Sequence, residues 1–170
     1  MTADRPPRPR TPIRVCLLGA TGTIGRATLR TLMRRGHEVV CFARRRPGDA
    51  VAVDGLEIRL VDVCDPVSIA HDGFRGERFD AVVSCMALRT GATRDAWAID
   101  HQAHVNVLAA ARGAGVGHFV LLSAICLQKP LLEFQQAKLA FEAALIEAGL
   151  TYSIVRPTAF FKSLSGQVSG

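Results

Sequence analysis

The sequence is poor in aromatic residues and has no long apolar run. Aromatic side chains make up 6% of the 170 residues, with one Trp and one Tyr. Nucleic-acid-binding surfaces interleave aromatic and basic side chains, so this scarcity argues against a nucleic-acid partner despite the net charge of +6. No apolar stretch approaches the roughly 20 residues that a membrane-spanning helix needs. With 49% hydrophobic and 21% charged residues, the composition predicts a globular protein.

The five cysteines include no Cys-x-x-Cys pair, and their number is odd. Cys16, Cys41 and Cys85 lie within or beside apolar runs. We interpret them as small buried hydrophobic side chains in a reducing cytosol, rather than as disulfides or metal ligands. The sequence therefore predicts no metal site.

Residues 1–12 are rich in Pro and Arg and lack the apolar segment of a signal peptide. We predict a disordered basic tail over 1–12 and one domain over 13–170. The chain stops soon after its last expected strand, and residues 165–170 have the composition of a loop. We therefore expect a truncated domain that lacks a C-terminal substrate-binding part.

Short apolar runs alternate with helical patterns throughout the domain. The expected strands are 14–18, 37–43, 56–61, 80–85, 118–123 and 151–155. The expected helices are 23–35, a short helix opened by Asp65-Pro66, 95–112 and 132–148. This alternation predicts an α/β fold, a Rossmann-type doubly wound parallel sheet of about six strands with helices on both faces.

The most informative stretch follows the first expected strand, where residues 15–25 read VCLLGATGTIG. Gly19 permits a tight turn, Gly22 leaves room for a pyrophosphate, and Gly25 lets the helix pack closely on the strand. Free N–H groups at the helix start would hold the phosphate charge. The alternative is a structural strand–turn–helix without a ligand. The predicted cofactor-binding residues of this loop are Gly19, Thr21, Gly22, Thr23, Ile24 and Gly25.

Arg44 and Arg45 follow the second expected strand, which ends without a carboxylate. An acidic residue at this place binds the ribose hydroxyl of NAD, whereas an arginine accommodates the 2′-phosphate of NADP. We therefore predict NADPH as cofactor, with a solvated arginine turn as the alternative. Asp62 is predicted to accept the adenine amine or to serve as a turn carboxylate. The other predicted contacts, at the ends of later strands, are Val63, Cys85, Met86, Ala87 and Pro157.

This pattern resembles the extended and atypical short-chain dehydrogenase/reductase superfamily. The resemblance implies that a serine after the fifth strand and a Tyr-x-x-x-Lys on the next helix carry the chemistry. Ser123 and Lys138 match this pattern, but Phe134 occupies the tyrosine position and cannot donate a proton. Lys138 would still hydrogen-bond the nicotinamide ribose. Asp100 stands where the superfamily often has a helical asparagine.

Three longer strings, 95–103, 121–134 and 156–164, are similar to the divinyl chlorophyllide a 8-vinyl reductase family. This resemblance covers nearly all of the chain after the tail. It implies NADPH-dependent reduction of the 8-vinyl group of divinyl (proto)chlorophyllide to ethyl in chlorophyll or bacteriochlorophyll biosynthesis. The substrate would be a tetrapyrrole, and the location the bacterial cytoplasm or the periphery of a photosynthetic membrane. Because negative charge can spread through the macrocycle, this reaction needs no local phenol donor.

Phe134 agrees equally well with an NmrA-like NADP-binding redox sensor, or with an inactive cofactor-binding fragment. Trp97 and Phe160 are both candidates to stack on a flat macrocycle, although core packing is the preferred prediction for Trp97. His101 and His104 are predicted to be structural residues rather than proton donors.

Overall fold

The computed structural model describes residues 11–45, 55–87, 93–125 and 127–158. Six strands form one parallel sheet in the order β3-β2-β1-β4-β5-β6. The chain places β2 and β3 on one side of β1 and then crosses over to place β4, β5 and β6 on the other side. This order confirms the predicted doubly wound topology. The strands are β1 (Arg14–Leu18), β2 (Glu38–Ala43), β3 (Glu57–Leu60), β4 (Ala81–Ser84), β5 (His118–Leu122) and β6 (Thr151–Val155).

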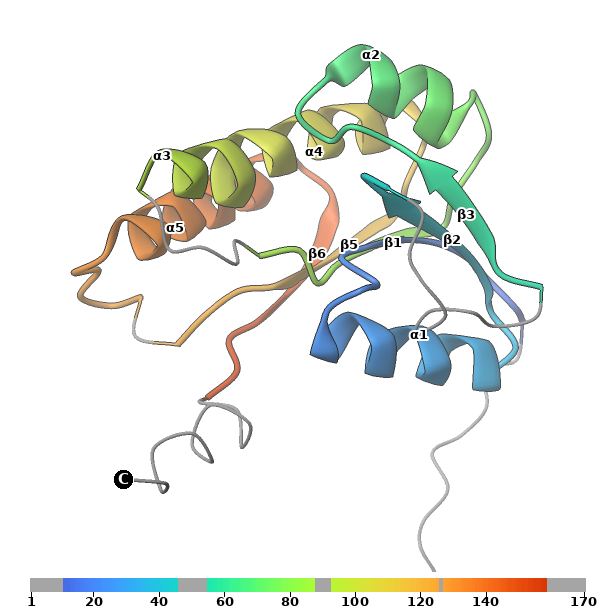
Figure 1. Ribbon diagram of the computed structural model, residues 1–170, viewed down its shortest axis with the longest axis horizontal. Helices are drawn as coiled ribbons and strands as arrows, with labels where there is room; N and C mark the ends of the chain where they lie inside the picture. The colour runs from blue at the N-terminus through green and yellow to red at the C-terminus, as the bar shows by residue number, and fades with distance from the viewer. Residues whose placement is uncertain (1–10, 46–54, 88–92, 126, 159–170) are drawn as a thin grey trace, which may run out of the picture.

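Helices cover both faces of the sheet (Figure 1). Helix α1 (Thr23–Arg34) lies on one face, and the other helices lie on the opposite face. The second layer contains α2 (Pro66–Ser68), α3 (Thr93–Ala96), α4 (His104–Gly113) and α5 (Glu133–Glu147). Among the described residues, no helix is long and apolar enough to cross a membrane.

Two helical stretches depart from the regular α-helix that the sequence predicted. Helix α2 continues as a π-helical segment, η2 (Ile69–Phe74), and α3 joins α4 through a second one, η3 (Trp97–Ala103). Asp65 caps α2 as expected, because its carboxylate accepts the Val67 N–H at 2.9 Å. A π-helical turn is wider than an α-helical turn and is frequent at functional sites.

The core consists of two hydrophobic clusters, one on each face of the sheet, because successive strand residues point to opposite faces. In β1, Cys16 and Leu18 join the cluster under α4 and α5, whereas Leu17 packs with Leu29 of α1. Cys16 and Cys41 are buried as predicted. Burial raises the pKa of the Cys41 thiol to about 12, which keeps it protonated. Cys85 is only half-buried and Cys64 is exposed.

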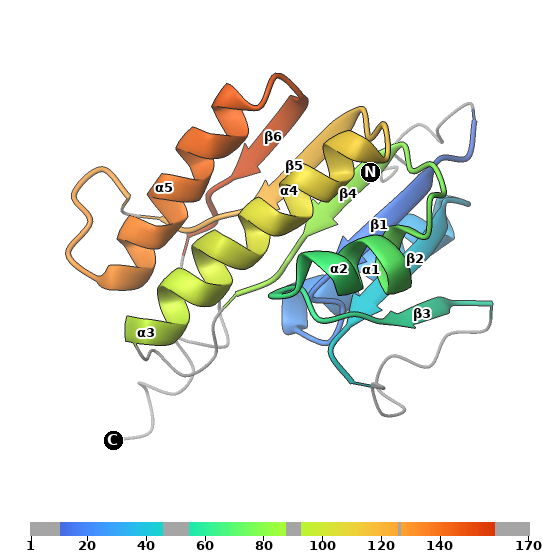
Figure 2. The ribbon, with the colours of Figure 1, turned by 90° about the horizontal axis from the view of Figure 1, so that it is seen from above.

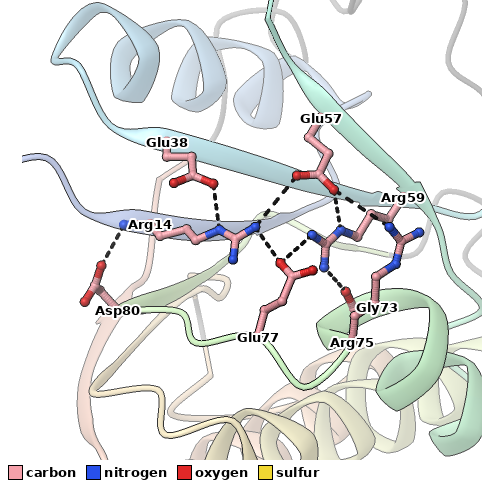
Figure 3. Close-up of polar contacts among 8 residues, drawn as sticks. All are labelled: Arg14, Glu38, Glu57, Arg59, Gly73, Arg75, Glu77 and Asp80. Atoms are coloured by element: carbon pink, nitrogen blue, oxygen red, sulfur yellow. Dashed lines mark hydrogen bonds and ion pairs between the residues drawn. The ribbon is translucent and has the colours of Figure 1, made fainter.

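At the amino ends of β1, β2 and β3, charged side chains form a network (Figure 3). The Arg14 guanidinium lies 2.7 Å from Glu38 and 2.6 Å from Glu77. The Arg59 guanidinium lies 2.7 Å from Glu57 and 2.7 Å from Glu77. Glu77 thus joins two arginines that come from non-adjacent strands.

Arg59 is the buried centre of this network, since its side chain is only 2% exposed. It donates to the Gly73 carbonyl at 2.5 Å, at the end of η2. Its guanidinium and that of Arg14 both lie over the Phe79 ring, at 5.8 and 4.7 Å from the ring centroid. The network therefore fastens η2 and the segment before β4 to the amino edge of the sheet.

Candidate cofactor and active site

The glycine turn between β1 and α1 is tight at two positions and open at the third. Gly19 has φ +74°, and a Cβ there would lie 2.6 Å from the Cys85 carbonyl group. A Cβ on Gly25 would lie 2.0 Å from the Gly19 carbonyl oxygen. A Cβ on Gly22 would meet only that same oxygen among the described atoms within 4 Å, at 3.5 Å. The fold itself therefore requires Gly19 and Gly25, whereas Gly22 leaves a free surface.

Helix α1 begins at this free surface. Within the described part of the chain, no side chain caps Gly22 and no acidic residue stands in the first helical turn. The first N–H groups of a helix have no intrahelical acceptor, and the helix dipole makes this end positive. Thr21 and Thr23 are exposed beside them, and Ile24 is half-buried. These features fit an anionic pyrophosphate at this turn.

Arg44 and Arg45 lie at the same edge, directly after β2, and both are exposed. Ala43, the residue before them, accepts the Val61 N–H at 3.0 Å, so the ends of β2 and β3 lie together. Asp62 follows β3 there, and its Oδ1 accepts the Cys64 N–H at 2.9 Å. Asp62 is therefore observed as a turn carboxylate, and its contact with adenine stays a prediction. The cofactor contact of half-buried Val63 also stays a prediction.

The end of β4 packs directly against the glycine turn. The Cys85 N–H donates to the Leu18 carbonyl at 2.9 Å, and the Cys85 thiol lies 3.6 Å from the Thr28 hydroxyl of α1. The Met86 N–H donates to the buried Ser84 hydroxyl at 3.3 Å. The predicted residues Cys85 and Met86 are thus brought beside Gly19, and Ala87 follows them directly.

The same Ser84 hydroxyl bonds to His104, a fully buried residue of α4. His104 Nε2 lies 2.8 Å from Ser84 Oγ, and Nδ1 lies 2.9 Å from the Ile99 carbonyl oxygen. Since a carbonyl only accepts, Nδ1 carries the proton and Nε2 accepts from Ser84. Burial, assisted by the Lys138 charge, lowers the pKa of His104 to about 3. The ring is therefore neutral near pH 7 and serves as a structural residue.

Lys138 and Asp100 form a buried ion pair between α5 and η3. Lys138 Nζ lies 2.8 Å from Asp100 Oδ1, and both side chains are almost fully enclosed. Partners in such a pair are held in a fixed geometry, because separating them would leave an uncompensated buried charge. Figure 2 shows α5 running beside the α3–α4 helix, which places this pair between the two helices. The sequence singled out both residues but did not predict that they pair.

Ser123, directly after β5, makes a hydrogen bond that sequence reasoning missed. Its hydroxyl donates to Glu142 Oε1 at 2.5 Å, and the buried Glu142 carboxylate also accepts from Arg156. The Ser123 N–H donates to the Val155 carbonyl at 2.8 Å. Glu142 follows Lys138 by four residues on α5, so both side chains lie on the same face of the helix. This spacing was the sequence signal that could have identified Glu142. Glu142 thereby joins the ends of β5 and β6, where half-buried Pro157 follows Arg156.

The prediction that Trp97 packs in the core was wrong. Its side chain is 40% exposed, because the first turn of η3 extends past the end of the sheet. The indole N–H donates to Glu133 Oε2 at 2.7 Å, and the ring contacts the His101 ring edge-on at 5.5 Å between centroids. Phe134 is half-buried at the start of α5, one turn before Lys138. The predicted substrate residue Phe160 lies outside the described residues.

A parallel doubly wound sheet with a glycine turn and an uncapped helix start defines the Rossmann-type dinucleotide-binding proteins. The model of the NAD(P)H-binding family matches residues 19–168, and the chain belongs to this family. The protein therefore takes a nicotinamide cofactor, as predicted.

Two curated relatives carry the name divinyl chlorophyllide a 8-vinyl-reductase, chloroplastic. The rice protein (Oryza sativa subsp. indica) is 51% identical over 168 residues, covering 91% of this chain and 42% of its own length. The maize protein (Zea mays) is 49% identical over 168 residues, with the same two coverages. The resemblance predicted from the sequence is therefore confirmed. The chain spans about two-fifths of the length of these relatives.

Among solved structures, the Bordetella bronchiseptica enzyme WbmG in complex with NAD superposes with a TM-score of 0.76. The match covers 86% of this chain and 53% of that one, at 20% identity. An identity this low supports the fold alone. Within the residues that the structure describes, no group of three or more His, Cys, Asp or Glu side chains is placed to hold a metal ion.

Proposed function

We propose that this chain is the NADPH-binding part of an 8-vinyl reductase, which reduces the 8-vinyl group of divinyl (proto)chlorophyllide to an ethyl group. The observation that carries the proposal is the 51% identity to the rice reductase over 91% of the chain. The proposal includes the tetrapyrrole substrate and a bacterial location in the cytoplasm or at the periphery of a photosynthetic membrane.

In this proposal the carboxyl edge of the sheet holds the cofactor. The α1 N-terminus and the open surface at Gly22 receive the pyrophosphate, and Arg44 with Arg45 binds the 2′-phosphate that distinguishes NADPH from NADH. The cofactor, when bound, supplies a hydride. The Lys138 ammonium has three donors, one of which is directed at Asp100, and in this proposal another hydrogen-bonds the nicotinamide ribose.

The side chains around Lys138 support reduction of a carbon–carbon double bond rather than of a carbonyl. A carbonyl reductase needs donors aimed at the developing oxyanion. Here Phe134 has no proton to donate, and the Ser123 hydroxyl donates to Glu142 instead. When a vinyl group conjugated to a macrocycle accepts hydride, the negative charge spreads through the ring, and no local oxyanion donor is required. A proton then adds to the resulting anion and completes the ethyl group.

The direct test is chromatography of divinyl chlorophyllide a after incubation with this chain and NADPH, beside an NADH control. An 8-ethyl product that depends on NADPH is expected. If the chain binds NADPH but forms no product, it acts as a cofactor-binding unit without catalysis, and the proposed activity is wrong for this chain.

Cofactor choice is tested separately with Arg44→Asp. We expect the Kd for NADPH to rise by about tenfold to a hundredfold, because a phosphate contact becomes a repulsion, while the Kd for NADH changes little. The control is Arg112→Asp, the same charge change at an exposed residue near the C-terminal end of α4. Equal weakening of NADPH and NADH by Arg44→Asp would contradict the phosphate role.

The role of Phe134 is tested by restoring the superfamily's phenol. Phe134→Tyr should leave the rate of vinyl reduction unchanged or lower, because no step of the proposal uses a donor at this position. A large gain in kcat would show that a phenolic proton donor is useful and that the proposed mechanism is wrong.

A further inference from the structure

Three of the exposed large apolar side chains in the described residues lie near the start of α5. Leu131 is 87% exposed and Leu132 is 56% exposed, in the loop that leads into α5. Trp97 of the neighbouring helix is 40% exposed. We call these three side chains, together with half-buried Phe134, the apolar ledge.

The ledge is rigidly supported although its side chains face outward. The N–H groups of Leu131 and Leu132 both donate to Gln135 Oε1, at 2.9 and 3.0 Å, and Gln135 itself is buried. The Trp97 indole N–H donates to Glu133 at 2.7 Å, which ties the two helices together. Exposed apolar side chains that lie close together on a fixed backbone are typical of binding surfaces.

The ledge is continuous with the candidate active site. Phe134 precedes Lys138 by one turn of α5, and Trp97 precedes Asp100 by three residues of η3. Since Lys138 and Asp100 are joined at 2.8 Å, the ledge lies one turn beyond their ion pair at the carboxyl edge of the sheet. A molecule that reaches from Lys138 toward solvent between these helix starts would therefore meet Trp97 and the leucines.

We infer that the apolar ledge binds one face of the tetrapyrrole macrocycle; this rests on the proposed function. A macrocycle is flat, aromatic and wide, so it needs an apolar surface broader than a single side chain. An indole ring and two leucines at fixed positions supply that surface, and the indole adds the geometry of aromatic stacking. The occupant is therefore the substrate ring, with its vinyl edge directed toward the nicotinamide end of the cofactor site.

The chain offers a direct probe, because Trp97 is its single tryptophan. Divinyl chlorophyllide a is titrated into the chain in the presence of NADPH, and binding is followed by quenching of Trp97 fluorescence and by the absorbance of the pigment. The test variant is the double substitution Leu131→Ser/Leu132→Ser, which keeps Trp97. The matched control is Ile146→Ser, a 51% exposed apolar residue near the far end of the same helix.

The double variant should weaken pigment binding by about tenfold or more, because the macrocycle loses two apolar contacts. Ile146→Ser should leave pigment affinity unchanged, and the Kd for NADPH should be unaltered in every variant. If the wild-type chain binds the pigment and the double variant binds it equally well, the inference is wrong while the proposed function stands. If the wild-type chain neither binds nor reduces the pigment, the proposed function fails as well.

Sedimentation of the same proteins distinguishes a second occupant. If Leu131→Ser/Leu132→Ser dissociates a dimer without changing pigment affinity, the ledge is an interface between two copies of the chain, and the inference is overturned.

Discussion

In the part of the sheet formed by β1, β2 and β3, the two edges use arginine in opposite ways. At the amino edge, Arg14 and Arg59 are enclosed by glutamates, and hydrogen bonds from Arg59 and Arg14 lower the pKa of Glu77. At the carboxyl edge, Arg44 and Arg45 are exposed, and among the described residues neither forms an ion pair with a carboxylate. Charges neutralised within the protein hold elements together, whereas unpaired charges are available to an anionic ligand. Damage at the amino edge should therefore lower stability, and damage at the carboxyl edge should lower cofactor affinity.

The largest expected effect is at a carboxyl-edge residue, Gly25, whose substitution should lower stability as well as cofactor affinity. Gly25→Ala would place its Cβ 2.0 Å from the Gly19 carbonyl oxygen, so backbone must move. We expect a loss of about 4 kcal/mol in the free energy of unfolding, together with loss of NADPH binding. Urea denaturation and calorimetric titration measure the two effects.

Gly22→Ala is the matched comparison in the same turn, because its Cβ would have an ordinary contact at 3.5 Å. It should change stability by less than about 1 kcal/mol, yet weaken NADPH binding at least tenfold by filling the space of the pyrophosphate. Unchanged NADPH affinity in Gly22→Ala would argue against this turn as the phosphate site.

The second prediction concerns the amino edge alone. Arg59→Ala removes the buried partner of Glu57, Glu77 and the Gly73 carbonyl, and should lower the free energy of unfolding by about 3 kcal/mol. Because the proposed cofactor site lies at the opposite edge, the Kd for NADPH should stay within about twofold under conditions where the variant is folded. A much weaker NADPH affinity in folded Arg59→Ala would show that the two edges are coupled.

The smallest expected effect concerns His104, which is buried at the start of α4. Its pKa is about 3 in the folded protein and near 6.5 when unfolded, so the unfolded state binds the extra proton between these values. Stability should therefore be constant above pH 7 and fall by about 1 kcal/mol between pH 7 and pH 5.5. His104→Gln should remove this fall, whereas His71→Gln, at an exposed position, should retain it. An unchanged pH profile in His104→Gln would assign the fall to another group.

The sequence predicted what depends on local pattern. All six strands were expected within one residue of their observed bounds, because parallel buried strands are short apolar runs between turn signals. Gly19 and Gly25 of the glycine turn were predictable from the sequence, since each answers a distinct steric demand, whereas the pyrophosphate role of Gly22 stays a prediction. The Asp65 cap followed from the same local logic, because its partner N–H is two residues away.

What the sequence could not predict depends on partners that are distant along the chain. The π-helical turns of η2 and η3 interrupt no visible pattern in the sequence. The Lys138–Asp100 and Ser123–Glu142 contacts join residues on different elements, and residue types alone do not reveal which of several partners will meet. Trp97 was predicted to be buried because aromatic residues usually are, but its place beyond the sheet end leaves the ring in solvent.

The hydrogen bond from Ser123 to Glu142 also constrains how the catalytic repertoire of this scaffold can change. A hydroxyl has one hydrogen, and here Glu142 accepts it at 2.5 Å. Installing a tyrosine at position 134 would thus restore only one of the two donors that a carbonyl reductase uses. Conversion to an alcohol-forming enzyme requires at least two substitutions that act together, one at Phe134 and one at Glu142. Neither substitution alone would supply both donors. The effects of the two substitutions on carbonyl reduction would therefore depend on each other, which is epistasis.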